Sequence, residues 1–161
     1  MFTGPTALPG RRSFPSREGG ATTKVMRLAA LDVGDVRIGL AVCDELGLTV
    51  RGVGTIRRVG GRRDLEAVAE ALGPYEPAKL VAGLPLNMDG TEGPQAARVR
   101  AFAERLGSHL GLSVELWDER LTTFEAESVL RSAGVPSSRR RGLVDQEAAA
   151  IILESYLARP A

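Results

Sequence analysis

One stretch limits what the chain can fold into more than any other. An apolar run, Leu28–Leu31, ends in the carboxylate of Asp32, and Gly34 and Gly39 then lead into a second apolar run. A short apolar run bounded by glycine predicts a buried strand, where a carboxylate is costly unless a cation meets it. Glycines let a backbone, a phosphate or a metal come close. We interpret the stretch as a hairpin that presents Asp32 at the top of a sheet; the alternative is that Asp32 only starts a turn.

The composition is that of a single globular domain. The chain has 161 residues, of which 43% are hydrophobic, and a formal net charge of +1, so any nucleic-acid site must come from local clusters of Lys and Arg. Residues 1–24 have no apolar periodicity and predict a flexible tail, which leaves 25–161 as the domain. The single cysteine, Cys43, excludes an internal disulfide and fits a reducing cytoplasm, and no apolar stretch is long enough to span a membrane.

Hydrophobic periodicity predicts strands and helices in the order β-β-β-α-β-α-β-α-α. The strands are expected at 26–32, 37–43, 49–57, 79–83 and 113–117, and the helices at 62–72, 94–110, 122–132 and 144–157. Short turns make the first three strands antiparallel, while the last two arrive through helices and should run parallel to the first. The prediction is an α/β fold: a mixed five-stranded sheet with helices on both faces.

Three acidic positions can converge in this fold. Asp32 ends the first strand, Asp118 or Glu119 ends the fifth, and Asp145 begins the last helix. If the first and fifth strands are parallel neighbours, their carboxyl ends share the edge where open α/β sheets place their sites. Asp145 belongs to the otherwise apolar face of the last helix, with Ala148, Ala149, Ile152 and Tyr156.

A divalent cation would remove the repulsion between such carboxylates. Oxygen ligands alone suit hard ions, so the hypothesis is Mg²⁺ or Mn²⁺ bound by Asp32, by Asp118 or Glu119, and by Asp145. Two such ions can activate water and stabilise the leaving oxygen of a phosphodiester. Taken singly, Asp145 could be a helix N-cap and Glu119 a surface ion-pair partner of Arg120.

Basic residues flank the three acids. Arg37 follows the first acid, Arg120 the second, and Arg139, Arg140 and Arg141 lie in the loop expected directly before Asp145. Contacts of this kind hold the phosphates of a nucleic acid. The alternative for a short arginine run is a solvated loop, but its place beside an inward carboxylate favours phosphate binding.

Four motifs of the chain resemble those of the YqgF/RuvX family. They are Leu31–Gly34 with Arg37–Ala41, Gly83–Thr91, Trp117–Thr123 and Val144–Gln146, and the resemblance covers Met26 to about Leu157. Proteins of that family are similar to Holliday-junction resolvases and have the RNase H-like fold. The resemblance implies a metal-dependent nuclease of the bacterial cytoplasm, linked to maturation of the 5′ end of 16S ribosomal RNA. It also implies that Asp32, Glu119 and Asp145 carry the acidic, catalytic positions.

Other functions stay open from the sequence. Branched DNA is an alternative substrate to RNA; symmetric cutting of a junction would call for a homodimer, whereas trimming of RNA would not. A non-catalytic RNA-binding module could keep the fold. A phosphotransferase or ATPase of the actin and sugar-kinase type could share Asp32-Val33-Gly34, but the chain is too short for two such domains. Asn87, after the fourth strand, either contacts substrate or shapes a turn.

Overall fold

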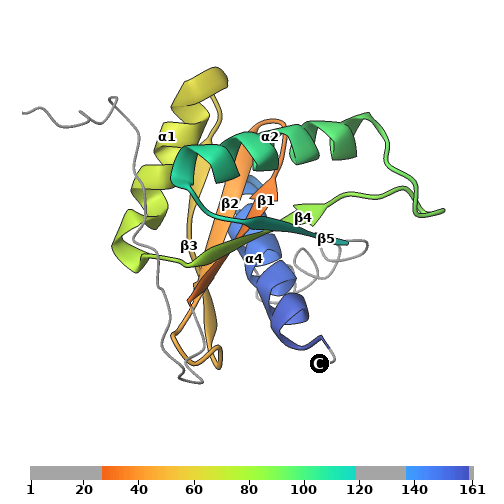
Figure 1. Ribbon diagram of the computed structural model, residues 1–161. Helices are drawn as coiled ribbons and strands as arrows, with labels where there is room; N and C mark the ends of the chain where they lie inside the picture. The colour runs from red at the N-terminus through yellow and green to blue at the C-terminus, as the bar shows by residue number, and fades with distance from the viewer. Residues whose placement is uncertain (1–26, 119–136, 160–161) are drawn as a thin grey trace, which may run out of the picture.

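The computed structural model describes residues 27–118 and 137–159, with the backbone alone over 137–146. Its elements are β1 (Leu28–Val33), β2 (Arg37–Cys43), β3 (Val50–Arg57), α1 (Gly61–Leu72), the short 3-10 helix η1 (Gly73–Tyr75), β4 (Lys79–Leu84), α2 (Pro94–Leu110), β5 (Val114–Asp118) and α4 (Ser137–Leu157) (Figure 1). This order agrees with the elements expected from the sequence. The tail expected at 1–24 and the helix expected at 122–132 lie outside the described residues.

The five strands form one mixed sheet in the order β3-β2-β1-β4-β5. β2 is antiparallel to β1 and β3, and β4 is parallel to β1 and β5, which confirms the predicted sheet. The first and fifth strands are not direct neighbours, because β4 lies between them; their carboxyl ends still share one edge, since both strands run parallel to β4. The reason for the strand order is the composition of β4: its run is apolar nearly throughout and suits burial on both faces, whereas β5 is half-buried along most of its length, as an edge strand can be.

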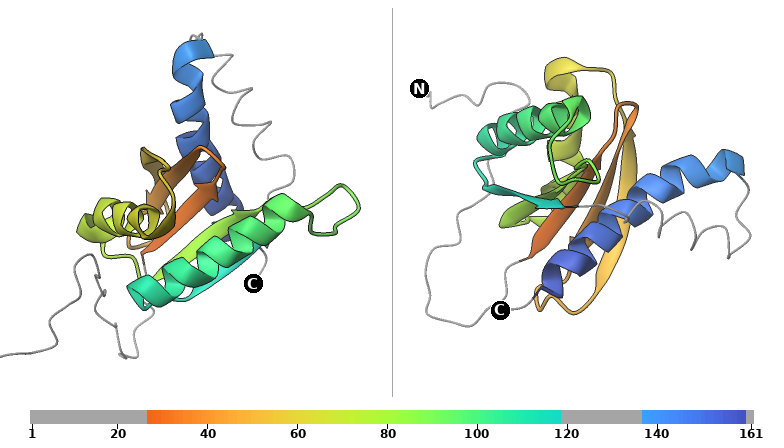
Figure 2. Two further views of the ribbon diagram at one scale, coloured as in Figure 1. Left: turned by 90° about the horizontal axis from the view of Figure 1, so that it is seen from above. Right: turned by 90° about the vertical axis from the view of Figure 1, so that its right-hand side faces the viewer.

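Helices cover both faces of this sheet, α1 and α2 on one and α4 on the other (Figure 2). The alternation of side chains along a strand divides the core between the two faces. In β1, Ala29 and Leu31 pack with the side chains of α1 and α2, whereas Leu28 and Ala30 pack with those of α4. The α4 face and the α1/α2 face are named accordingly below.

The boundaries of α2 follow local signals in the sequence. Gly93 is the N-cap, Pro94 takes the first helical position, and Gly111 ends the helix at φ 70°, a conformation that glycine adopts without strain. Cys43 is 1% exposed, as expected of a small buried side chain. In the part of the chain that the structure describes, no helix is long and apolar enough to cross a membrane.

The last helix is longer than its apolar pattern indicates. It begins at Ser137, not at about Val144, so Arg139–Arg141 belong to its first turns and the expectation that they lie in a loop is wrong. Arginine is a good helix former, and a single internal glycine such as Gly142 costs only about 1 kcal/mol relative to alanine. A run without apolar residues therefore extends the helix without leaving a periodic signal.

Candidate active site

Asp32 lies near the carboxyl end of β1 on the α4 face. It is the one half-buried residue of that strand, and the other five are buried. Leu28 and Ala30 pack beneath α4, and the alternation of side chains places Asp32 on the same face. The carboxylate thus stands at the rim of the core that α4 covers.

The strands on either side of Asp32 offer only main chain next to its side chain. Gly39 of β2 lies directly opposite Asp32. In β4, Ala82 pairs with Leu31, so the following residue, Gly83, lies beside Asp32 on the other side. Because neither glycine carries a side chain, the carboxylate has bare backbone on both sides, which leaves room for a cation or a phosphate.

The turn after Asp32 is closed by the main chain. The amide of Gly34 donates a hydrogen bond of 2.8 Å to the carbonyl oxygen of Arg37. A Cβ atom at position 34 would lie 2.9 Å from that same oxygen, closer than side chains approach backbone. Glycine at position 34 is therefore a requirement of the turn that fixes the end of β1.

Arg58 supports this turn from the end of β3. Its Nη1 donates to the carbonyl oxygen of Gly34 at 2.9 Å, and its backbone amide donates to the carbonyl oxygen of Val36 at 2.8 Å. Its Nε donates to the carboxylate of Asp64 at 2.9 Å, and its guanidinium carbon lies 4.9 Å from the ring centroid of Phe102. The arginine thus ties the Asp32 turn to α1 and α2.

Asp64 is the buried anchor of Arg58. Its side chain is 1% exposed, and it also accepts the amides of Val59 at 2.9 Å and Gly60 at 3.1 Å. Burial opposes ionisation, but the hydrogen bonds from Val59, Arg58 and Gly60 outweigh it and hold the pKa of this carboxyl below the ordinary value. Neither Asp64 nor Arg58 was predicted from the sequence, because an acid in the first turn of a helix that follows an arginine is a weak signal.

Arg37 lies on the same face as Asp32. It begins β2 two residues before Gly39, so its side chain shares the α4 face. Arg57, the last residue of β3, pairs directly with Arg37 in the antiparallel ladder and shares that face. Arg37 was predicted from the sequence as a site residue and Arg57 was not, because their pairing depends on a register shift between Leu40 and Ala41.

Asp118 does not join Asp32. It pairs with Leu84 of β4, and Leu84 and the alternate β5 residue Leu116 pack in the core of the α1/α2 face. Asp118 therefore belongs to the opposite face of the sheet. Glu119 and Arg120 lie outside the described residues, so their predicted roles stay predictions.

The apolar face expected for the last helix is confirmed. Ala148, Ala149, Ile152 and Tyr156 are all buried under the sheet. The side chains of Arg139–Arg141 and of Asp145 are not among those described. Within the side chains that are described, no group of three or more His, Cys, Asp or Glu could hold a metal ion.

Asn87 organises the loop that follows β4. Its amide donates to the carbonyl oxygen of Thr91 at 2.8 Å, and its Nδ2 lies 2.9 Å from Thr91 Oγ1. Asp89 accepts the Thr91 hydroxyl at 2.6 Å. These contacts support the turn-shaping alternative for Asn87.

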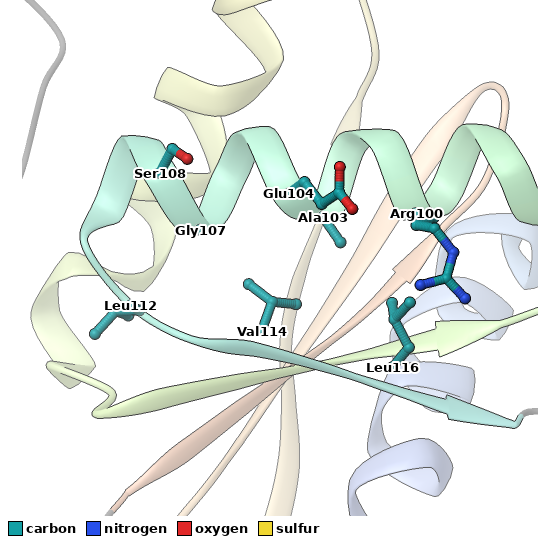
Figure 3. A pocket seen from close by; sticks show the side chains of 8 residues that line it. All are labelled: Arg100, Ala103, Glu104, Gly107, Ser108, Leu112, Val114 and Leu116. Carbon is teal, nitrogen blue, oxygen red and sulfur yellow. The ribbon is translucent and has the colours of Figure 1, made fainter.

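A hollow of about 470 Å³ lies between α2 and β5 (Figure 3). Arg100 and Glu104 extend over it from α2, and Val114 and Leu116 of β5 form its floor (Figure 3). It belongs to the α1/α2 face, whereas Asp32 belongs to the α4 face. No acid or arginine predicted for the site lines this hollow.

The strand order, the two helical layers and an acid at the carboxyl end of β1 define an RNase H-like fold. A search of solved structures supports this class. T. thermophilus RuvC in complex with a Holliday junction substrate matches with a TM-score of 0.51 at 18% identity, over 83% of this chain and 97% of that chain.

Sequence comparison then gives the family. The family model RuvX, described as Holliday junction resolvase, matches residues 26–159, and the chain belongs to this family. A protein named "Putative pre-16S rRNA nuclease" from Anaeromyxobacter dehalogenans (strain 2CP-C) is 56% identical over 136 residues, 84% of this chain and 99% of its own. A relative of the same name from Syntrophus aciditrophicus (strain SB) is 50% identical over 82% of this chain and 88% of its own. The resemblance noted in the sequence is confirmed, and with it, at the level of the family, a nuclease that hydrolyses phosphodiester bonds.

Proposed function

We propose that this chain is a divalent-metal-dependent nuclease whose acidic centre consists of Asp32, Glu119 and Asp145 and whose substrate is the 5′ end of pre-16S ribosomal RNA. The observation that carries the proposal is the place of Asp32. A carboxylate at the rim of a core, between Gly39 and Gly83, has the charge and the room that a cation and a phosphate need.

The path of α4 supports the assignment of Asp145. Ala149 packs with Ala41 of β2, which lies opposite Ala30 of β1. One turn earlier on the helix, Asp145 is displaced from Ala149 by about 6 Å along the axis. Asp32 is displaced from Ala30 by about 7 Å along β1. In Figure 1, α4 rises from its C-terminal end toward the end of the sheet where β1 stops, so both displacements share a direction.

The register of β5 supports Glu119 over Asp118. Asp118 belongs to the face of α1 and α2 and cannot share a ligand with Asp32. Glu119 is therefore the acid that we assign at the end of β5.

The donor set fits hard divalent cations. All three assigned side chains are carboxylates, and Cys43, the only cysteine of the chain, is buried at the other end of β2. Oxygen ligands of this kind suit Mg²⁺ or Mn²⁺, which supply activation of water and stabilisation of the leaving oxygen in phosphodiester hydrolysis. The protein's part is to hold the donors: Arg58 fixes the turn after Asp32, and the buried face of α4 fixes the helix that bears Asp145.

Arginines supply the contacts to nucleic acid in this proposal. Arg37 shares the face of Asp32, and we assign phosphate contacts to it, to Arg120 and to Arg139–Arg141. The names of the curated relatives favour pre-16S rRNA as the substrate, whereas the description of the family model favours branched DNA as a second candidate. The same proposal includes a cytoplasmic location and a monomeric or homodimeric state.

Replacement of Asp32 by Asn tests the acidic centre. The change keeps the size of the side chain and removes its charge, so we expect cleavage of a pre-16S rRNA fragment in Mg²⁺ or Mn²⁺ to fall by at least about 100-fold, with an unchanged circular-dichroism spectrum. Trp117, the only tryptophan of the chain, lies opposite Gly83 in β5. Quenching of its fluorescence by Mn²⁺ reports metal binding independently of cleavage, and we expect the substitution to weaken it.

Asp118→Asn and Glu119→Gln form the matched control. The two acids are adjacent in sequence, and only Glu119 is assigned to the site, so Glu119→Gln should abolish cleavage and Asp118→Asn should retain it. Full activity of the Asp32→Asn protein would refute the proposal. Cleavage of a four-way DNA junction in place of the RNA would move the substrate to the second candidate, and Mn²⁺ binding without cleavage of either would favour the non-catalytic module.

A further inference from the structure

We propose that Arg57 continues the phosphate-binding surface of this site. Together with Arg37 it forms an arginine pair that binds the sugar-phosphate backbone of the substrate strand beside the cleaved bond, so that the strand leaves the site across β2 toward the β3 edge. The inference rests on the proposed nuclease function and adds a binding residue and a strand direction to it.

The sheet register places the pair on the correct face. Arg37 and Arg57 are Cα partners in the ladder between β2 and β3, and Gly39, two residues after Arg37, lies opposite Asp32. Two strand spacings of about 4.8 Å and two residue steps of about 3.3 Å put the Cα of Arg57 roughly 12 Å from that of Asp32. This separation suits a phosphate that neighbours the cleaved one.

The pair combines two guanidinium groups on one face of an antiparallel ladder. Arg57 is exposed, and within the described part of the chain its side chain makes no hydrogen bond or ion pair. A phosphate beside the two guanidinium groups would match the planar donor geometry of arginine.

The edge of the sheet leaves the way to this pair open. In the described part of the chain β3 is the edge strand, and Arg57, its last residue, is exposed. α4 passes over β2 and β3 on the same face, and its first turns carry Arg139–Arg141. The direction across β2 and β3 is therefore the one along which Arg37 and Arg57 follow Asp32.

Arg51 provides a matched control on the same strand. It pairs with Val42 and faces the other side of the sheet, where its guanidinium carbon lies 5.4 Å from the ring centroid of Tyr75. Arg51→Gln and Arg57→Gln remove the same charge from the same strand. They differ in the face of the sheet and in the end of β3 from which the charge is removed.

The experiment measures the salt dependence of binding without divalent metal, so that no cleavage occurs. The probe is a fluorescein-labelled single-stranded RNA that spans the 5′ end of 16S rRNA, titrated by anisotropy from about 50 to 200 mM salt. Each lost phosphate contact lowers the slope of log K against log salt by about 0.7 on a single strand. We expect this loss for Arg57→Gln, full retention for Arg57→Lys, and an unchanged slope for Arg51→Gln.

The inference would be overturned if the salt slope of Arg57→Gln equalled that of the wild type, or if Arg51→Gln lost as much of the slope as Arg57→Gln. It would also be overturned if RNA binding by the wild type did not depend on salt. Cleavage assays separate this failure from failure of the proposed function. If Asp32→Asn is inactive and Arg57→Gln keeps its slope, the nuclease assignment stands and the arginine pair does not. In the expected case Arg57→Gln raises KM and leaves kcat near that of the wild type.

Discussion

Arg58 fixes the turn that follows Asp32. Arg58 reaches the carbonyl of Gly34 from the end of β3, and Asp64 in turn holds Arg58 from the first turn of α1. Three hydrogen-bond donors converge on the Asp64 carboxylate, which is almost fully buried. The position of the candidate metal ligand therefore depends on a charge buried on the other face of the sheet.

Asp64→Asn should destabilise the fold in a pH-dependent way. The pKa of Asp64 is lowered in the folded protein, so its stabilising contribution is present above the unfolded pKa of about 3.9 and is lost as the pH falls through the folded value. At pH 7 we expect the substitution to lower the free energy of unfolding by about 1–3 kcal/mol, because Arg58 loses its charged partner. Urea denaturation between pH 7 and pH 3 measures this difference, which should shrink below about pH 4.

Glu66→Gln is the control for Asp64→Asn. Glu66 lies on the same helix, and its ion pair with Arg62 is solvent-exposed, with 37% of the Glu66 side chain accessible, so its loss should have little effect at any pH. If Asp64→Asn loses as much stability at pH 3 as at pH 7, the carboxylate is not the source of the effect.

At the scale of elements, the β2–β3 hairpin holds the arginine pair to which we assign phosphate binding. Its open end carries Arg37 opposite Arg57, an arrangement that a fold selected for stability alone would avoid. The pairing of these two arginines could not be read from the strand ends alone, because the ladder that starts at Cys43 and Val50 would set Arg37 opposite Ile56. A register shift between Leu40 and Ala41 moves the partner by one residue and sets Arg57 opposite Arg37.

Arg57→Glu should stabilise the protein while it weakens binding to nucleic acid. The new carboxylate faces Arg37 across the ladder, so the free energy of unfolding should rise by about 0.2–1 kcal/mol at low salt, and the gain should fade as salt screens the pair. Thermal denaturation at 20 mM and 500 mM salt measures both effects. A lower stability at low salt would show that the two arginines do not repel each other in the folded chain.

The elements themselves were predictable where glycine and apolar runs mark both ends. β2 was expected at 37–43 and occupies Arg37–Cys43. Strand order was less accessible, because sequence places β4 and β5 both parallel to β1 without saying which is the neighbour; the more continuous burial of β4 decides it. The start of α4 escaped prediction because its first turns carry arginines and no apolar face.

At the scale of the whole molecule, α4 is fastened to the sheet at its C-terminal end. Lys79 Nζ lies 2.6 Å from Glu115 Oε1 and 2.8 Å from the hydroxyl of Tyr156, which donates to Glu115 at 2.8 Å. These hydrogen bonds raise the pKa of Lys79 and lower that of Glu115. Trp117 packs edge-on against Tyr156, with ring centroids 5.3 Å apart. This cluster of Lys79, Glu115, Trp117 and Tyr156 anchors the C-terminal half of α4, and the N-terminal half of the same helix carries Asp145.

Tyr156→Phe should weaken this cluster and leave the protein folded. The ring remains packed on Trp117, and the pair of Lys79 and Glu115 remains, so we expect a loss of about 0.5–1.5 kcal/mol in the free energy of unfolding. Tyr156→Ala removes the ring as well and should cost about 3–5 kcal/mol, the range known for large aromatic truncations. Chemical denaturation followed by circular dichroism and by Trp117 fluorescence measures both variants. Equal losses for the two would show that the hydroxyl carries the whole contribution.

The candidate site was predictable in part. The position of Asp32 at the carboxyl end of a strand, and the apolar face of the last helix, both followed from short patterns. Asp64 and Arg58 were not predictable, because their hydrogen bonds join segments through a buried charge that no periodicity reveals. The roles of Glu119 and Asp145 stay predictions that the variants above test.

On the two sides where strands adjoin Asp32, the space beside its carboxylate is bounded by main chain, since Gly39 and Gly83 lie there. A boundary made of backbone does not change when side chains elsewhere on the surface are exchanged. Relatives with different surface residues can therefore keep the same width between these two strands at the site. The same feature makes the space sensitive to substitution. One added methyl group at either glycine narrows it, and no change of side-chain rotamer can restore the lost width.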